Sequence, residues 1–270
     1  ANVLELDQLA RLTEFFPFPR AARERLAATD PRGSVRNLRL AWSGDVENPQ
    51  RYSLRAGFSK LATRANRGIP GFSGLTGRIE ASDTGGSVAL GSERVELELP
   101  GIFPESPIRL DSLAGQITWK IVPDRIDLGF SGLSLANRDL AGTLSGSYSV
   151  RQGAAPIDVT GRFSRVEGRT VYRYIPKAPE KVVAYLKSTI RDGGSKDVRL
   201  RLKGDLSKFP FEDGSSGLFQ IVAKVTDGHL DYAAGWPNAT GLAGDLIFEG
   251  RGMRVEATRG SIVGTVARCA

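Results

Sequence analysis

The sequence predicts a mainly β protein with a large antiparallel sheet. After residue 33, apolar and polar residues alternate with a period of two in run after run. Turn sequences rich in Gly and Asp separate these runs. Glycine supplies 32 of 270 residues, well above its usual share of about 7%. Alternation of this kind is typical of antiparallel sheet with one apolar and one solvated face.

Residues 1–33 are predicted to form an N-terminal helical segment. Residues with helical spacing share one face there: Leu6, Leu9, Ala10 and Thr13. A second short helix is predicted to begin at Pro19. A turn at Asp30–Gly33 ends the segment, and the period of the sequence then changes from about 3.6 to 2.

Two β sections follow, at 34–175 and 195–270. Alternation is clearest at Val95–Leu99, Ile126–Phe130 and Val198–Leu202. Turns are predicted at Asp83–Gly86, Pro123–Asp124, Gln152–Gly153 and Asp227–Gly228. The second section is expected to continue the sheet of the first.

A covering helix is predicted between the two sections. The segment is 176–194, and the helix itself is expected at about 179–191. Its apolar stripe consists of Val182, Val183, Leu186 and Ile190, and Asp192–Gly194 is expected to end it. It is shorter than the roughly 20 apolar residues that a membrane-spanning helix needs. We therefore expect it to cover an end or an edge of the sheet.

A degenerate five-residue pattern recurs along the strands: apolar, any, Gly, any, apolar. Its copies are Leu75–Ile79, Leu113–Ile117, Leu140–Leu144, Val159–Phe163, Leu202–Leu206 and Leu242–Leu246. At period two, each glycine lies on the apolar face with its two neighbours. Glycine there permits bending, bulging or the close approach of another group. Such strands form either a curled, open trough or a closed barrel or sandwich whose apolar faces seal each other.

Little in the sequence indicates catalysis. The chain has one His, one Cys and one Met, so metal and nucleophile chemistry have few candidates. Asp83–Gly85 is the tripeptide of aspartic proteases, but it lies between two alternating runs and is interpreted as a β-turn. His229 is interpreted as a surface turn residue, and Cys269 has no assigned role. We expect no enzyme activity, no cofactor and no metal.

The net charge of +7 raises the question of an anionic partner. Basic residues are scattered, and the densest group, between Arg20 and Arg39, has no aromatic stacking pattern and no nucleic-acid motif. We interpret it as a solvated face and expect no nucleic-acid partner.

An ordered set of sequence phrases covers nearly the whole chain. They are Pro31–Trp42, Gly71–Ile79, Gly85–Leu90, Leu97–Phe103, Leu113–Trp119, Tyr174–Pro176, Leu202–Leu206, Phe209–Phe211, Leu230–Tyr232, Gly235–Pro237 and Leu242–Leu246. In these phrases the chain resembles the YhdP-type, AsmA-like envelope proteins of Gram-negative bacteria.

That resemblance implies a middle section of a larger periplasmic protein, which an N-terminal helix anchors in the inner membrane. Family members have a long β-sheet rolled into an apolar-lined groove and are implicated in moving phospholipid towards the outer membrane. For this chain the resemblance implies one large, curved antiparallel sheet that forms an open groove, taco-like or a partial barrel. The implied partners are phospholipid, the remaining sections of the same chain and other envelope proteins. The family has no catalytic residues to carry over.

The candidate lipid-binding residues are apolar side chains of the alternating runs. They are Leu75, Ile79, Leu97, Leu99, Ile117, Trp119, Leu128, Phe130, Leu144, Leu200, Leu202, Leu246 and Phe248. Lining a groove, they would hide the methylenes of an acyl chain from water, each worth about 0.8 kcal/mol. The alternative is a structural or partner-binding β module, in which the same residues form a closed core.

Overall fold

The computed structural model describes residues 3–8, 28–45, 49–66, 70–151, 153–209, 211, 215–231, 237–250, 252–262 and 265–268. The chain divides into two compact units. Unit 1 contains Ala1–Pro100 and Ser106–Leu135, and unit 2 contains Gly101–Glu105 and Ala136–Ala270. The division falls inside the predicted first β section, and each unit is described by itself.

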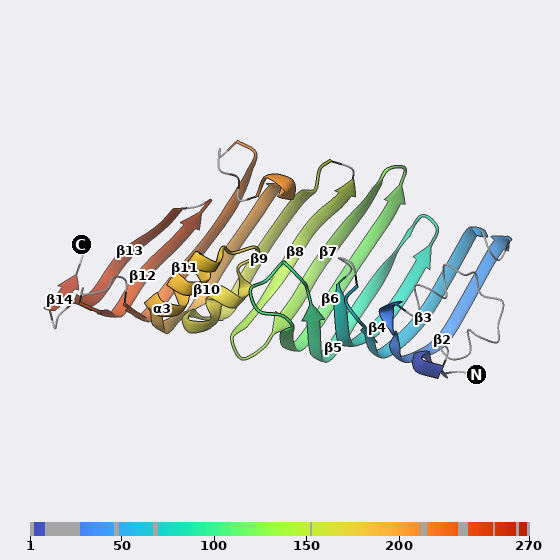
Figure 1. Ribbon diagram of the computed structural model, residues 1–270, viewed down its shortest axis with the longest axis horizontal. Helices are drawn as coiled ribbons and strands as arrows, with labels where there is room; N and C mark the ends of the chain where they lie inside the picture. The colour runs from blue at the N-terminus through green and yellow to red at the C-terminus, as the bar shows by residue number, and fades with distance from the viewer. Residues whose placement is uncertain are drawn as a thin grey trace. The chain divides into compact units, whose positions relative to one another are not determined.

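Unit 1 consists of one short and six long strands that follow one another in sequence order (Figure 1). They are β1 (Val3–Glu5), β2 (Arg32–Gly44), β3 (Pro49–Thr63), β4 (Gly71–Ser82), β5 (Gly85–Glu98), β6 (Ile108–Val122) and β7 (Arg125–Ala136). From β1 to β6 each strand is antiparallel to the next. The most deeply buried side chain, Val95 at 1% exposure, lies opposite Leu110 between β5 and β6.

Unit 2 has the same kind of sheet, again in sequence order and antiparallel throughout. Its strands are β8 (Leu140–Arg151), β9 (Pro156–Glu167), β10 (Ile190–Asp205), β11 (Gly217–Leu230), β12 (Ala239–Glu249), β13 (Gly252–Ile262) and β14 (Thr265–Arg268). Two helical elements, η1 (Gly168–Tyr174) and α3 (Glu180–Thr189), connect β9 to β10, and η2 (Leu206–Lys208) follows β10. We call Gly168–Thr189 the covering segment.

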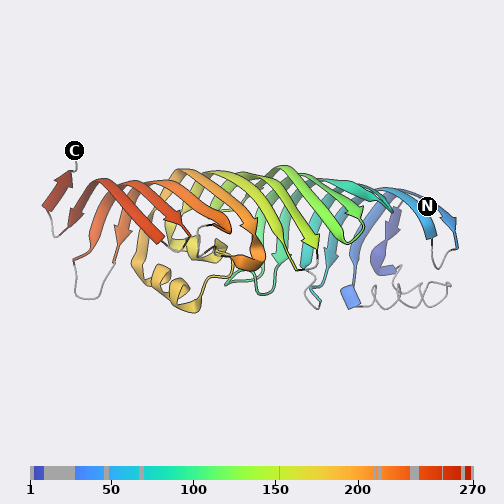
Figure 2. The ribbon, with the colours of Figure 1, turned by 90° about the horizontal axis from the view of Figure 1, so that it is seen from above.

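The predicted fold class is confirmed: the chain is mainly β, and antiparallel strands form a sheet that does not close on itself. Within the described residues β1 pairs only with β2, and β14 only with β13. The strands of each unit are curved, and those of unit 2 arch over the covering segment, drawn in yellow (Figure 2). None of the helices in the described part of the chain is long and apolar enough to cross a membrane.

The N-terminus differs from the expected helical segment at both ends. Val3–Glu5 forms β1, which pairs with Ser34–Arg36, and β2 already begins at Arg32. Residues 6–8 and 28–29 are helical, whereas the predicted helix start at Pro19 lies outside the described residues. Local spacing cannot reveal β1, because three residues become a strand only through their partner.

Turn predictions had mixed outcomes. The turns at Asp83–Thr84 and Pro123–Asp124 are confirmed as the ends of hairpins, and Gln152 lies outside the described residues. The predicted turn at Asp227–Gly228 is wrong, because β11 runs through these residues, with a shift in its register against β12 between Val225 and Gly228. The helix is present as α3, but β10 begins directly after it at Ile190, so Asp192–Gly194 lies inside a strand.

Candidate functional site

One face of the unit 2 sheet is an apolar surface, because its cross-strand partners carry apolar side chains or glycine in successive rows. The first row is Gly142, Phe163, Val198, Ala223, Leu246 and Val255. The second is Leu144, Gly161, Leu200, Ile221, Phe248 and Met253. The third is Gly146, Val159, Leu202 and Phe219. The intervening residues, such as Arg162 and Arg199, form the polar face of the same strands.

Unit 1 has a similar pair of faces. One apolar row contains Ala56, Ile79, Val88 and Ile117, and the next contains Leu40, Leu54, Ala81, Gly86 and Trp119. On the opposite, polar face the partners are residues such as Arg55, Glu80 and Ser87. The alternation in the sequence thus assigns faces as well as strands.

Ten of the thirteen predicted lining residues fall on these surfaces. Leu144, Leu200, Leu202, Leu246 and Phe248 share the apolar face of unit 2. In unit 1 the apolar rows contain Ile79, Ile117 and Trp119, and Leu75 and Leu97 lie opposite Leu61 and Ile108. Leu128 and Phe130 lie in β7, whereas Leu99 lies just beyond the end of β5.

All thirteen predicted side chains are half-buried. None belongs to the buried apolar core, whose members include Val95, Leu110, Val198 and Phe219. Side chains sealed between two packed layers would lose nearly all contact with water, as those core residues do. The predicted lining residues therefore belong to partly open apolar surfaces.

Aromatic side chains from the neighbouring strand pack over two of the glycines on these faces. A Cβ built on Gly142 would lie 2.4 Å from the Phe163 ring, and one on Gly86 would lie 2.4 Å from the Trp119 ring. An aromatic side chain packed over a cross-strand glycine is a known way to stabilise a glycine in a sheet. These dents in the apolar face are therefore filled by the protein itself, and the glycines permit the close approach of a ring.

Unit 2 holds an apolar cavity of about 140 Å³ on this face. Its lining comes from β9 to β13 and from η1, and includes Val171, Val198, Ala223, Leu246 and Val255. Cavities of about 150 Å³ with such linings stay free of water and accept small apolar guests. The cavity adjoins the half-buried apolar rows of the same face, so a bound apolar molecule could extend from the cavity along these rows.

An aromatic cluster limits the apolar face beyond the third row. The rings meet edge to face in the order Phe211, Phe209, Phe219 and Phe248, with successive centroids 5.7, 5.3 and 5.9 Å apart. Phe211 is 3% exposed and lies over Gly204 and Gly217. The residues after β10 thus close this end, and the covering segment lies towards the other.

A polar network attaches the covering segment to the rest of unit 2. Nearly buried Asp139 accepts hydrogen bonds from Arg173 Nη1 (3.1 Å) and Tyr174 Oη (3.0 Å). Asn137 Nδ2 donates to Tyr174 Oη at 2.9 Å. Glu105 pairs with Arg173 Nε (2.8 Å) and with Lys187 Nζ of α3 (3.1 Å).

This network makes a pH-dependent contribution to stability at alkaline pH. Burial raises the pKa of Tyr174 to about 12, and the Asp139 carboxylate beside it acts in the same direction. In the unfolded chain a tyrosine ionises near pH 10. Between these values only the unfolded state releases this proton, so we expect stability to fall as the pH rises from about 10 to about 12. Unfolding midpoints across this range, for the wild type and Tyr174→Phe, measure the effect; equal slopes would contradict it.

Sequence reasoning missed several residues of this surface. Phe163 and Ile221 lie on the same face as the predicted lining residues but were not among them. The pattern at Val159–Phe163 already placed Phe163 on an apolar face, and alternation in β11 would have found Ile221. Glu105, Asn137 and Asp139 gave no signal, because their partners lie more than 30 residues away. His229 is half-buried within β11, 3.5 Å from Asp231, and not in a turn.

A protein-family model described as YhdP protein matches residues 1–269. Comparisons with curated proteins and with solved structures each found no match.

Proposed function

Since the chain belongs to the YhdP protein family, a family of lipid-transport-type envelope proteins, we propose that it is a non-enzymatic section that carries phospholipid acyl chains on its apolar β-faces. The full-length protein is anchored in the inner membrane and carries the phospholipid through the periplasm, between the inner and outer membranes. Phospholipid, the other sections of the chain and further envelope proteins are its partners.

The observation that carries this proposal is the partly open apolar face of unit 2 with its cavity. Rows of half-buried Leu, Ile and Phe side chains adjoin a space of about 140 Å³ with an almost wholly apolar lining. An acyl chain laid along these rows would leave water at a gain of about 0.8 kcal/mol for each buried methylene. The backbone polar groups of the face are already paired in the sheet, so contact with lipid leaves none of them unsatisfied.

Native mass spectrometry of the chain isolated from a Gram-negative envelope tests the proposal. We expect phospholipid to remain bound in mild conditions and to be released when the protein is unfolded. A protein that carries no lipid, and takes up none when delipidated and offered phospholipid, would contradict it. That result, with saturable binding to an envelope protein, would favour the partner-binding β module.

A further inference from the structure

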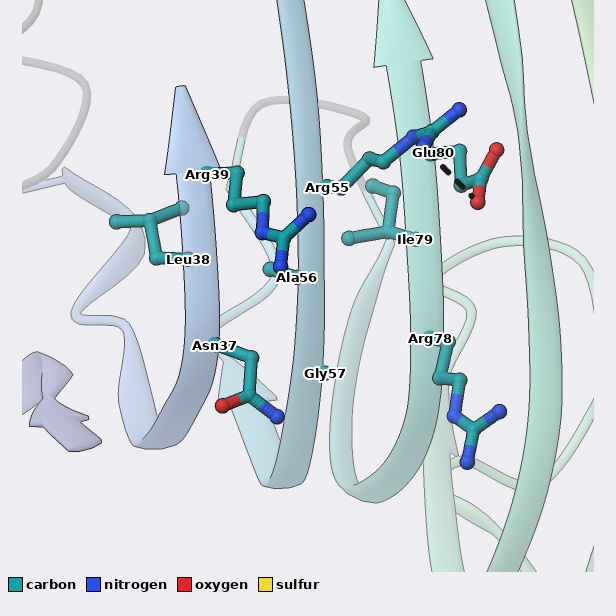
Figure 3. A pocket seen from close by; sticks show the side chains of 9 residues that line it. All are labelled: Asn37, Leu38, Arg39, Arg55, Ala56, Gly57, Arg78, Ile79 and Glu80. Atoms are coloured by element: carbon teal, nitrogen blue, oxygen red, sulfur yellow. Dashed lines mark ion pairs between the residues drawn. The ribbon is translucent and has the colours of Figure 1, made fainter. Parts of the chain in front are cut away.

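The polar face of unit 1 brings together arginines that are far apart in the sequence. Arg39 of β2 lies directly opposite Arg55 of β3, and Arg36 and Arg78 lie on either side of Gly57. We call Arg36, Arg39, Arg55 and Arg78 the arginine patch. Figure 3 shows three of its members, Arg39, Arg55 and Arg78, on three neighbouring strands around Gly57, with Asn37 beside them.

The charge of the patch is largely uncompensated. Arg55 lies 3.6 Å from Glu80, and both side chains are more than 60% exposed. In the described part of the chain Arg36, Arg39 and Arg78 have no acidic partner within ion-pair distance. Like charges placed directly opposite each other in a sheet destabilise it, as Arg39 and Arg55 do. An anionic partner would relieve that repulsion.

Small residues and shallow depressions surround the arginines and leave the sheet exposed there. Two adjoining shallow depressions of about 650 and 490 Å³ share Asn37, Gly57 and Arg78 in their lining. A Cβ on Gly57 would meet no atom of the described residues closer than 3.8 Å, so none of them covers the backbone there. Ala89 and Gly91, which line the second depression on the same polar face, are also small residues.

These features fit an array of anions better than one ion or a protein. Adjacent strands are about 4.8 Å apart, so the backbones of arginines on β2 and β4 are about 10 Å apart. In Figure 3 the Arg39 and Arg78 guanidinium groups lie well apart and do not point at a common centre. Protein interfaces depend on clusters of buried aromatic or aliphatic anchors. The cross-strand partners on this face are Arg, Glu, Ser, Ala and Gly, and the exposed Leu38 that also lines the first depression is a single aliphatic side chain among them. Phosphates on a membrane surface supply many anions without an anchor.

We propose that the arginine patch docks unit 1 onto the phosphate-rich surface of an anionic phospholipid bilayer. The guanidinium groups contact lipid phosphates as bidentate donors, and the apolar face, on the other side of the sheet, stays free. This docking does not depend on the proposed lipid carriage.

Flotation of the full chain with vesicles tests the docking. We expect binding to vesicles that contain phosphatidylglycerol, little binding to pure phosphatidylcholine vesicles, and release at high salt. The variant R36Q/R39Q/R78Q should bind on the order of a hundredfold more weakly, about fivefold for each arginine. The control R125Q/R199Q/R254Q removes the same charge from exposed ion pairs elsewhere and should bind nearly as the wild type does.

The single variant Arg39→Gln shows whether a loss of binding comes from a loss of folding. It removes a like-charge pair, so it should be at least as stable as the wild type. Its affinity for the vesicles should still fall about fivefold. Equal losses in the two triple variants would overturn the proposal, as would full competition by millimolar inorganic phosphate at constant ionic strength. Binding of an acidic protein, with no binding to anionic vesicles, would also overturn it. Lipid retained in native mass spectrometry should be the same in R36Q/R39Q/R78Q and the wild type, which separates docking from carriage.

Discussion

Leu246→Glu is expected to reduce the phospholipid bound by the chain at least tenfold. Leu246 lies in the first apolar row, between Ala223 and Val255, and lines the cavity of unit 2. A carboxylate there would stand among apolar side chains without a partner, and an acyl chain packed over it would remove its remaining water. Covering an unpaired charge costs several kcal/mol, more than the burial of a few methylenes returns.

The next residue in β12 provides a matched control. Ile247 is also half-buried but lies on the polar face, between Val222 and Arg254. Ile247→Glu adds the same charge to the same strand, next to a guanidinium, and should retain phospholipid. Lipid extracted per mole of folded protein measures both variants, and unfolding midpoints show whether they remain folded. Equal retention by the two variants would contradict lipid binding on this face.

The fold class, and much of the candidate surface, could be predicted from the sequence because both depend on a local property. A period of two fixes which side chains share a face, whatever the partner strands are. Leu200, Leu202, Leu246 and Phe248 therefore share one face of unit 2, although Leu202 and Leu246 are 44 residues apart in the sequence. The alternating run Val95–Leu99 extends one residue beyond the end of β5, because alternation does not show where a strand stops pairing.

The remaining features depend on register between distant residues, which a single strand does not encode. Asp192–Gly194 and Asp227–Gly228 have turn composition, yet they form facing irregularities in β10 and β11. Gly193 and Asp227 have φ values of 105° and 53°, and a Cβ on Gly193 would lie 2.7 Å from Gly228 Cα. A turn and a bulge need the same backbone freedom, so local composition could not distinguish them. The arginine patch was missed likewise, because Arg36 and Arg78 meet only through β3.

Asp139→Ala is expected to lower the free energy of unfolding by about 2–3 kcal/mol. The wild-type carboxylate is nearly buried and accepts hydrogen bonds from Arg173 and Tyr174. Without it, the Tyr174 hydroxyl loses its acceptor, and Glu105 is the one acidic partner that Arg173 retains among the described residues. Arg173 keeps some contact with solvent, which places the effect below that of a fully buried pair.

The consequence should be local as well as global, because these bonds attach η1 to the start of β8. In Asp139→Ala, hydrogen exchange should accelerate in Gly168–Thr189 more than in β10 or β11, whose ladders do not depend on Asp139. Asp197→Ala is the control, since it removes an exposed partner of Arg199 in the same unit and should cost less than about 1 kcal/mol. If the two substitutions destabilise equally, or if exchange rises evenly across unit 2, the network does not fasten the covering segment. If the segment alone loosens, the cavity beneath it becomes accessible without unfolding the sheet.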